Sequence, residues 1–188
     1  DVIRGQQIGL VCNQASVLPD TFVHAADAFG ERDDFELTTL FGPQHGIRGD
    51  LQDNMIETPH VRDERTGKMV YSLYSETRVP TEEMVKDIDT FVVDLQDVGC
   101  RIYTFVYTMA NCMRAAKQFG KKVVVCDRPN PINGNAIEGN ITEHEFKSFV
   151  GQFELPTRHG MTIGELAKMF NEHFGIGCDL EVVEMEGW

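Results

Sequence analysis

The stretch Thr90–Cys126, TFVVDLQDVGCRIYTFVYTMANCMRAAKQFGKKVVVC, decides the fold of this chain. Thr90–Leu95 and Lys122–Cys126 are short, apolar and rich in β-branched residues, which is typical of strands buried on both faces. Between them, the pattern predicts a helix from about Thr104 to Phe119 that Gly120 closes, because glycine readily adopts the left-handed conformation at a helix end. A strand, a helix and a second strand form a right-handed crossover, so we expect the two strands to be parallel.

The same alternation of strands and helices extends over the rest of the chain. Further strands are predicted at Gln7–Cys12, Phe35–Phe41, Lys68–Leu73 and Leu180–Met185, and further helices from Asp20 or Thr21 to about Arg32, from Thr81, and over Thr162–Phe174, where Thr162 and Glu165 are spaced as a capping box. Residues 42–67 and 128–160 are expected to be irregular, and such long loops are usually functional. The predicted fold is α/β, with a mostly parallel sheet and helices on both faces, in three layers.

Composition limits the kinds of function. The chain has 188 residues, enough for one domain, and its formal net charge of −13 argues against binding nucleic acid or an anionic membrane surface. No apolar run approaches the ~20 residues that a membrane span needs. The five cysteines are an odd number without a CxxC pair, so we expect small buried side chains rather than a zinc site or a redox dithiol, and we expect no cofactor.

Polar residues follow three of the predicted strands. They are Gln44, His45 and Arg48 after the second strand, Asp94, Gln96, Asp97 and Arg101 after the fourth, and Asp127, Arg128 and Asn130 after the fifth. Open α/β sheets bind ligands beyond the carboxyl ends of their strands, so these clusters predict a site for a small polar ligand. Arg158 and His159 precede a predicted helix, where an anion pocket is expected.

Other interpretations of these residues remain open. An Asp beside an Arg is often an ion pair that holds a loop, and Asp127 equally suits a turn cap. Asp94, Asp97, Asp127 and His45 are candidates to converge on a hard cation. Neither GxGxxG nor GxxxxGK[ST] occurs, so nucleotide binding of the familiar kinds lacks support.

These residues lie in segments through which the chain resembles the NamZ/YbbC-like family, which is associated with exo-β-N-acetylmuramidases. The matching segments are LFGPQHGIRG at 40–49, Ser72-Leu73-Tyr74 with Arg78 and Pro80, VDLQDVGCRIYT at 93–104, DRPNP at 127–131 and RHGMTIGEL at 158–166. The resemblance implies a Rossmann-like domain that forms the N-terminal half of a longer protein, with a C-terminal region completing a cleft. It also implies a cell-envelope location, whereas the free cysteines favour the cytoplasm slightly.

The activity that the resemblance implies is hydrolysis of the β-1,4 bond that releases N-acetylmuramic acid from the non-reducing end of peptidoglycan fragments. Asp94 or Asp97 is then the expected acid/base, with Gln44 and His45 orienting the sugar. Candidates to bind the lactyl carboxylate are Arg48, Arg101, Arg128 and Arg158, and the remaining expected sugar contacts are Gln96, Asp127, Asn130 and His159.

One position departs from the family pattern. Many relatives have glutamate where this chain has Gln44, and glutamine cannot give up a proton. The acid must then come from Asp94, Asp97, Asp127 or Glu143, or from outside this chain, and the 2-acetamido group of the sugar is a candidate internal nucleophile. The alternatives are a non-catalytic module that binds sugars or anions and a metal-dependent hydrolase.

Overall fold

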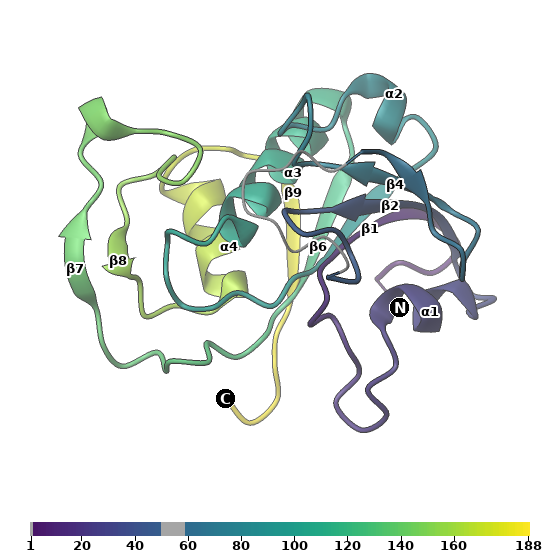
Figure 1. Ribbon diagram of the computed structural model, residues 1–188, viewed down its shortest axis with the longest axis horizontal. Helices are drawn as coiled ribbons and strands as arrows, with labels where there is room; N and C mark the ends of the chain where they lie inside the picture. The colour runs from purple at the N-terminus through teal and green to yellow at the C-terminus, as the bar shows by residue number, and fades with distance from the viewer. Residues whose placement is uncertain (1, 50–58) are drawn as a thin grey trace.

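The computed structural model describes residues 2–49 and 59–188 (Figure 1). Within them, a seven-stranded sheet has the order β3-β4-β2-β1-β5-β6-β9. The strands are β1 Gln7–Cys12, β2 Glu36–Gly42, β3 Val61–Arg62, β4 Met69–Ser72, β5 Thr90–Asp94, β6 Lys122–Cys126 and β9 Asp179–Val183. Every pairing is parallel except that of β3 with β4. The parallel strands, taken in chain order, stand as 3-2-1-4-5-6, which is the strand order of the Rossmann fold.

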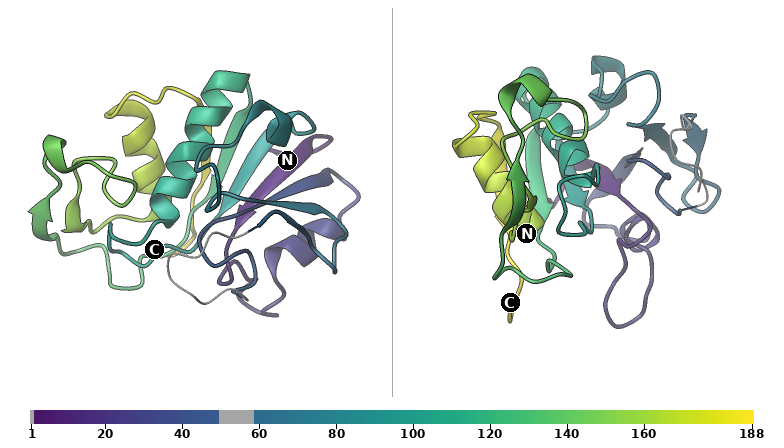
Figure 2. Two further views of the ribbon diagram at one scale, coloured as in Figure 1. Left: turned by 45° about the horizontal axis from the view of Figure 1, so that its top comes forward. Right: turned by 60° about the vertical axis from the view of Figure 1, so that its left-hand side comes forward.

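Helices cover both faces of this sheet (Figure 2). The first, α1 (Ala25–Gly30), packs on one face, and α2 (Glu82–Val85), α3 (Phe105–Phe119) and α4 (Ile163–Glu172) pack on the other. The predicted three-layered α/β fold is therefore confirmed. None of the described helices is both long and apolar enough to cross a membrane.

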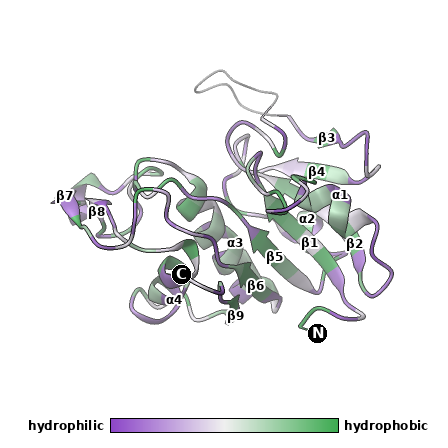
Figure 3. Cartoon of the chain, turned by 90° about the horizontal axis from the view of Figure 1, so that it is seen from below, coloured by the Kyte–Doolittle hydropathy of each residue, from purple (hydrophilic) through white to green (hydrophobic). Residues whose placement is uncertain are grey.

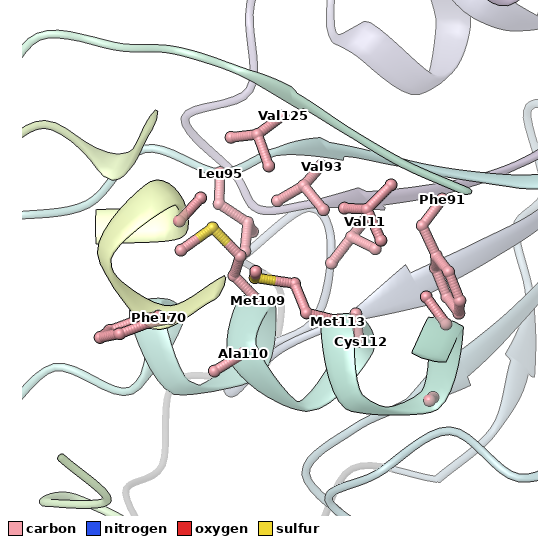
Figure 4. Packing of buried hydrophobic residues seen from close by; sticks show 14 of the residues in the cluster. Val11, Phe91, Val93, Leu95, Met109, Ala110, Cys112, Met113, Val125 and Phe170 are labelled. Atoms are coloured by element: carbon pink, nitrogen blue, oxygen red, sulfur yellow. The ribbon is translucent and has the colours of Figure 1, made fainter. Parts of the chain in front are cut away.

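The central strands are apolar on both faces because each face meets a helix. In Figure 4, Val11, Val93 and Val125 of three neighbouring strands lie over Met109 and Met113 of α3, and all five side chains are buried. The opposite face packs against α1. Figure 3 shows β5 and β6 in the green of hydrophobic residues, whereas polar residues predominate toward the periphery. This two-sided burial is what the uninterrupted apolar runs predicted.

Two helix ends confirm the sequence analysis and one corrects it. Gly120 closes α3 in the left-handed conformation with φ of 66°, and Thr162 and Glu165 form the predicted capping box of α4. The helix expected from Asp20 or Thr21 instead begins at Ala25. Its N-cap is His24, whose Nδ1 accepts a hydrogen bond from the Ala26 N–H at 3.2 Å.

The long segments expected to be irregular contain further structure. In the described part of 42–67, β3 adds an antiparallel edge strand of two residues, too short to show a pattern; residues 50–58 lie outside the described residues. In 128–160, β7 (Glu138–Ile141) and β8 (Pro156–Arg158) form a separate antiparallel pair, joined through the 3₁₀ turn His144–Phe146. Figure 1 shows this pair at the left, apart from the main sheet. The sequence hides β7 because all four of its residues are exposed and no apolar alternation marks it.

Candidate active site

A cavity of about 440 Å³ opens beyond the carboxyl ends of β1, β2 and β5. Its described lining residues are Gln14, Gln44, His45, Val98, Ile102, Tyr103, Thr104 and Phe105. Strands β1 and β5 are neighbours in the sheet, and the chain leaves β1 toward one edge and β5 toward the other. The cavity therefore lies at the topological switch point, where open α/β sheets bind their ligands.

The loop after β2 brings two of the predicted site residues to this cavity. A tight turn, closed by the Gly46 N–H donating to the Pro43 carbonyl at 3.1 Å, presents Gln44 and His45. The φ angle of His45 is +72°, which places it in the left-handed region that residues other than glycine seldom adopt. Such conformations concentrate at functional sites, where the surrounding structure enforces them. The Oε1 atom of Gln44 accepts a hydrogen bond from the Thr104 hydroxyl at 3.4 Å.

Hydrogen bonds between the strand-end loops hold the cavity in shape. The Nδ2 of Asn13 donates to the Gln96 carbonyl at 3.0 Å, and the Nε2 of Gln96 donates to the Pro129 carbonyl at 2.9 Å. Because Nδ1 of His24 accepts the capping bond of α1, its Nε2 carries the proton and donates to the Ile47 carbonyl at 3.0 Å. The loops after β1, β2, β5 and β6 are thus tied to one another.

Asp94, at the end of β5, and Arg128, in the loop after β6, form an ion pair. The Arg128 Nε lies 2.6 Å from Asp94 Oδ1 and the Nη2 lies 2.9 Å from Oδ2, while the Asp94 side chain is only 9% exposed. The hydrogen bonds that Arg128 donates to the Asp94 carboxylate raise the pKa of Arg128. Both carboxylate oxygens are occupied and neither residue lines the cavity. This geometry argues against Asp94 as the proton donor and against Arg128 as the partner of a sugar carboxylate, and it favours the loop-holding ion pair.

Asp97 and His159 form a second buried pair. Asp97 Oδ2 accepts hydrogen bonds from the Gly99 N–H at 2.7 Å and from His159 Nε2 at 3.0 Å, and the side chains are 5% and 1% exposed. The Nδ1 of His159 accepts from the Met161 N–H at 3.2 Å, so the ring proton lies on Nε2. The other oxygen of Asp97 is shielded from solvent and has no hydrogen-bond partner within the described residues. Asp97 therefore holds the loop after β5 and does not reach the cavity.

Asn130 supports the same loop from the side of β6. Its Nδ2 donates to the Met161 carbonyl at 2.9 Å and its Oδ1 accepts from the Ile132 N–H at 3.1 Å. Gly99 passes so close that a Cβ there would lie 2.4 Å from the Asn130 Oδ1, and its φ is +84°. Only glycine satisfies both conditions at position 99. The Asn130 side chain packs directly against this glycine and bonds two backbone groups, so Asn130 has a structural role in this loop.

Asp127 caps α4, which was the alternative left open by the sequence. Its Oδ1 accepts from the Gly164 N–H at 2.7 Å and its Oδ2 from the Thr162 hydroxyl at 3.0 Å. The partial positive charge at the N-terminus of α4 also stabilises a carboxylate there. Asp127 therefore fixes the start of α4 rather than presenting its carboxylate to a ligand.

The remaining predicted arginines near β8 also lie outside the cavity lining. Arg158 donates to Glu138 at 3.0 Å and to the Ile132 carbonyl, so it links β8 to β7. The backbone N–H of Arg101 donates to the Thr157 carbonyl at 2.9 Å, and its Nε is buried without a hydrogen-bond partner among the described residues.

Arg48 is held by two carboxylates. Its three guanidinium nitrogens donate to Asp27 and Asp63, the shortest distances being 2.7 Å and 2.8 Å. Burial alone would raise the pKa of Asp63, but hydrogen bonds from Arg48 and Thr66 outweigh burial and lower this pKa to about 2. This geometry argues against Arg48 as the partner of a sugar carboxylate.

The Asp63 carboxylate predicts a pH dependence of stability. Because its pKa is lower in the folded than in the unfolded chain, the stabilisation is present above about pH 4 and is lost as the pH falls toward 2. We expect about 1–2 kcal/mol of unfolding free energy to disappear over this range in urea titrations. Arg48→Met should remove most of this slope, whereas Arg65→Met, which removes a more exposed partner of Asp27, should keep it. An unchanged slope in Arg48→Met would contradict this assignment.

Sequence reasoning missed most of the cavity lining. Val98, Ile102, Tyr103 and Phe105 are apolar or aromatic, and a search for charged clusters passes over such residues. Two signals could have indicated them: they lie within or directly after the Asp94–Arg101 cluster, and Val98, Ile102 and Tyr103 belong to the segment 93–104 that resembles the family. Among the described residues, no group of three or more His, Cys, Asp and Glu side chains is placed to hold a metal ion, so the alternative in which Asp94, Asp97, Asp127 and His45 converge on a cation lacks support.

Comparison with known proteins identifies the family. The family described as "Exo-beta-N-acetylmuramidase NamZ, N-terminal" matches residues 8–188. The chain belongs to this NamZ N-terminal family. A search of known proteins gives the same result: the chain is 50% identical over 186 residues to the peptidoglycan beta-N-acetylmuramidase NamZ of Bacillus subtilis (strain 168). That alignment covers 99% of this chain and 44% of the relative.

Two solved structures from Bacteroides fragilis share the fold of this NamZ N-terminal chain. Both are described as DUF1343 family proteins; one has a TM-score of 0.90 at 44% identity and the other a TM-score of 0.82 at 33% identity. Each comparison covers 100% of this chain and 47% or 49% of the neighbour. The chain therefore spans less than half the length of the relatives it matches.

Proposed function

We propose that this chain carries the sugar-binding site of a glycoside hydrolase that releases N-acetylmuramic acid from the non-reducing end of peptidoglycan fragments. The observation that carries the proposal is the cavity at the switch point, which Gln44 and His45 line from the turn after β2. The 50% identity to an enzyme named peptidoglycan beta-N-acetylmuramidase supports the reaction and the substrate class.

The lactyl carboxylate of the sugar is accommodated at the start of α3 in this proposal. Thr104 and Phe105 line the cavity, the first turn of α3 holds no acidic residue, and Thr104 makes no side-chain capping bond within the described structure. The N-terminus of a helix carries partial positive charge and unpaired N–H groups, which favour an anion. This replaces the arginines expected from the sequence, of which Arg48, Arg128 and Arg158 are engaged with carboxylates.

His45 is the acid/base residue in this proposal. None of the described lining residues carries a carboxylate, and His45 has the side-chain type that most often acts as a general acid or base in enzymes. His45 protonates the glycosidic oxygen while the 2-acetamido oxygen attacks C1, so that the C1–O bond breaks and the next sugar leaves. Water then opens the cyclic intermediate and returns a proton to His45. Substrate assistance of this kind needs one protein group fewer than the usual carboxylate pair.

Asp97 and His159 act as positioning residues in this scheme. They fix the loop after β5, which supplies Val98, Ile102 and Tyr103 to the cavity. We also propose that the chain forms a single domain. The further length of its relatives, beyond the share that this chain covers, then contributes to the cleft around the cavity.

The test is hydrolysis of the disaccharide N-acetylmuramyl-β-1,4-N-acetylglucosamine by the full-length protein. We expect release of free N-acetylmuramic acid, detected by chromatography, and no release from the internal bonds of longer glycans. Among the described lining residues none carries a carboxylate, and this observation, together with Gln44, favours a second candidate, a module that binds the sugar without cleaving it. Tight binding by calorimetry with no turnover, even in Gln44→Glu, would establish this candidate and reject the hydrolase.

A further inference from the structure

Two large apolar side chains stand exposed at the mouth of the cavity. Ile102 and Tyr103 both line it, and each is 55% exposed. Their neighbours Thr104 and Phe105 are buried at the start of α3. Within residues 102–105, the exposure is therefore confined to Ile102 and Tyr103.

The backbone that carries these two residues is firmly held. The Tyr103 N–H donates to the Cys100 carbonyl at 3.1 Å, and the Arg101 N–H donates to the Thr157 carbonyl at 2.9 Å. Asp97 anchors the same loop through Gly99. A rigid turn that leaves an aromatic ring in solvent next to a cavity is preorganised for a ligand, because aromatic side chains bring large contact area at small entropic cost.

We propose that Ile102 and Tyr103 form a platform for the second sugar, the N-acetylglucosamine on the leaving-group side of the scissile bond. This inference rests on the proposed function. An enzyme that removes the terminal sugar binds that sugar inside the cavity, so the rest of the glycan leaves through the mouth. A pyranose ring has an apolar face of C–H groups, which packs on an aromatic ring, whereas the anionic lactyl group of the first sugar needs the polar inner wall.

The experiment compares two substrates that differ only beyond the scissile bond. They are the disaccharide N-acetylmuramyl-β-1,4-N-acetylglucosamine and methyl β-N-acetylmuramide, which lacks the second sugar. In the full-length protein, Tyr103→Ala is expected to lower the ratio of kcat/KM for the disaccharide to kcat/KM for the methyl glycoside about five- to tenfold. Tyr103→Phe keeps the ring and should restore the ratio.

Phe146→Ala is the matched control. Phe146 is a second exposed aromatic residue, 68% accessible, in the 3₁₀ turn between β7 and β8 and absent from the cavity lining. Its replacement should leave the ratio unchanged. Equal effects of Tyr103→Ala on both substrates, or no effect on either, would overturn the platform while leaving the hydrolase intact. Failure of the unaltered protein to cleave either substrate would reject the proposed function and the platform with it.

Discussion

Replacing Arg128 with methionine is expected to lower the free energy of unfolding by about 3 kcal/mol. Methionine fills much of the same space but leaves the Asp94 carboxylate buried without its two hydrogen bonds, which lie at 2.6 Å and 2.9 Å. A buried charge that loses its partner keeps its desolvation penalty, and this penalty dominates the loss. Urea denaturation should show a lower midpoint with an unchanged m-value.

The chain offers a control with the same pairing geometry. Arg32 binds Asp34 through its Nε at 2.8 Å and its Nη2 at 2.9 Å, but the Arg32 side chain is 57% exposed. Arg32→Met should leave the midpoint within the error of the measurement, since exposed ion pairs contribute little. Adding Asp94→Asn to Arg128→Met should recover part of the loss, because it removes the unpaired charge. If Arg128→Met and Arg32→Met had equal effects, burial would not be the cause.

The same ion pair shows why the sequence predicted the edge of the sheet at which the cavity lies better than it predicted the residues that line the cavity. The apolar runs revealed the strands, and the rule for open sheets placed the polar clusters at one edge. The direction in which Arg128 points, however, toward a ligand or toward Asp94, depends on the order of the strands in the sheet. Strand β6 pairs with β5 so that Val93 lies beside Val125, which brings the residues after both strands together. Strand order is a tertiary property, and spacing within one strand does not contain it.

The predicted start of the first helix was wrong for a related reason. Asp20 and Thr21 are good capping residues by type. The structure instead begins the helix at Ala25 with His24 as its N-cap, because the Nε2 of His24 also lies 3.0 Å from the carbonyls of both Asn13 and Ile47 and so joins two loops at the cavity. Contacts between distant segments outweigh local capping preference here. Where local signals had no competitor, as at Gly120 and in the capping box of α4, the sequence predicted the structure correctly.

Replacing His45 with asparagine in the full-length protein is expected to lower kcat/KM for the muramyl disaccharide by about 10²–10⁴-fold. Asparagine is the informative substitution because it tolerates a positive φ, here +72°, better than most side chains and so preserves the turn. His45→Gly removes the side chain without backbone strain and should lose the same activity. The melting temperature of both variants should stay close to that of the unaltered protein.

The leaving group distinguishes proton donation from sugar binding by His45. A nitrophenolate departs with little help from an acid, so a nitrophenyl β-N-acetylmuramide should lose far less activity in His45→Asn than the disaccharide does. If His45 only oriented the sugar, both substrates would lose activity equally, because the muramyl ring is the same in each. His144→Ala is the control, since His144 is exposed between β7 and β8 and does not line the cavity, and both substrates should be cleaved normally. A loss that depends on the leaving group therefore requires a proton donor at position 45, which the neighbouring Gln44 cannot replace.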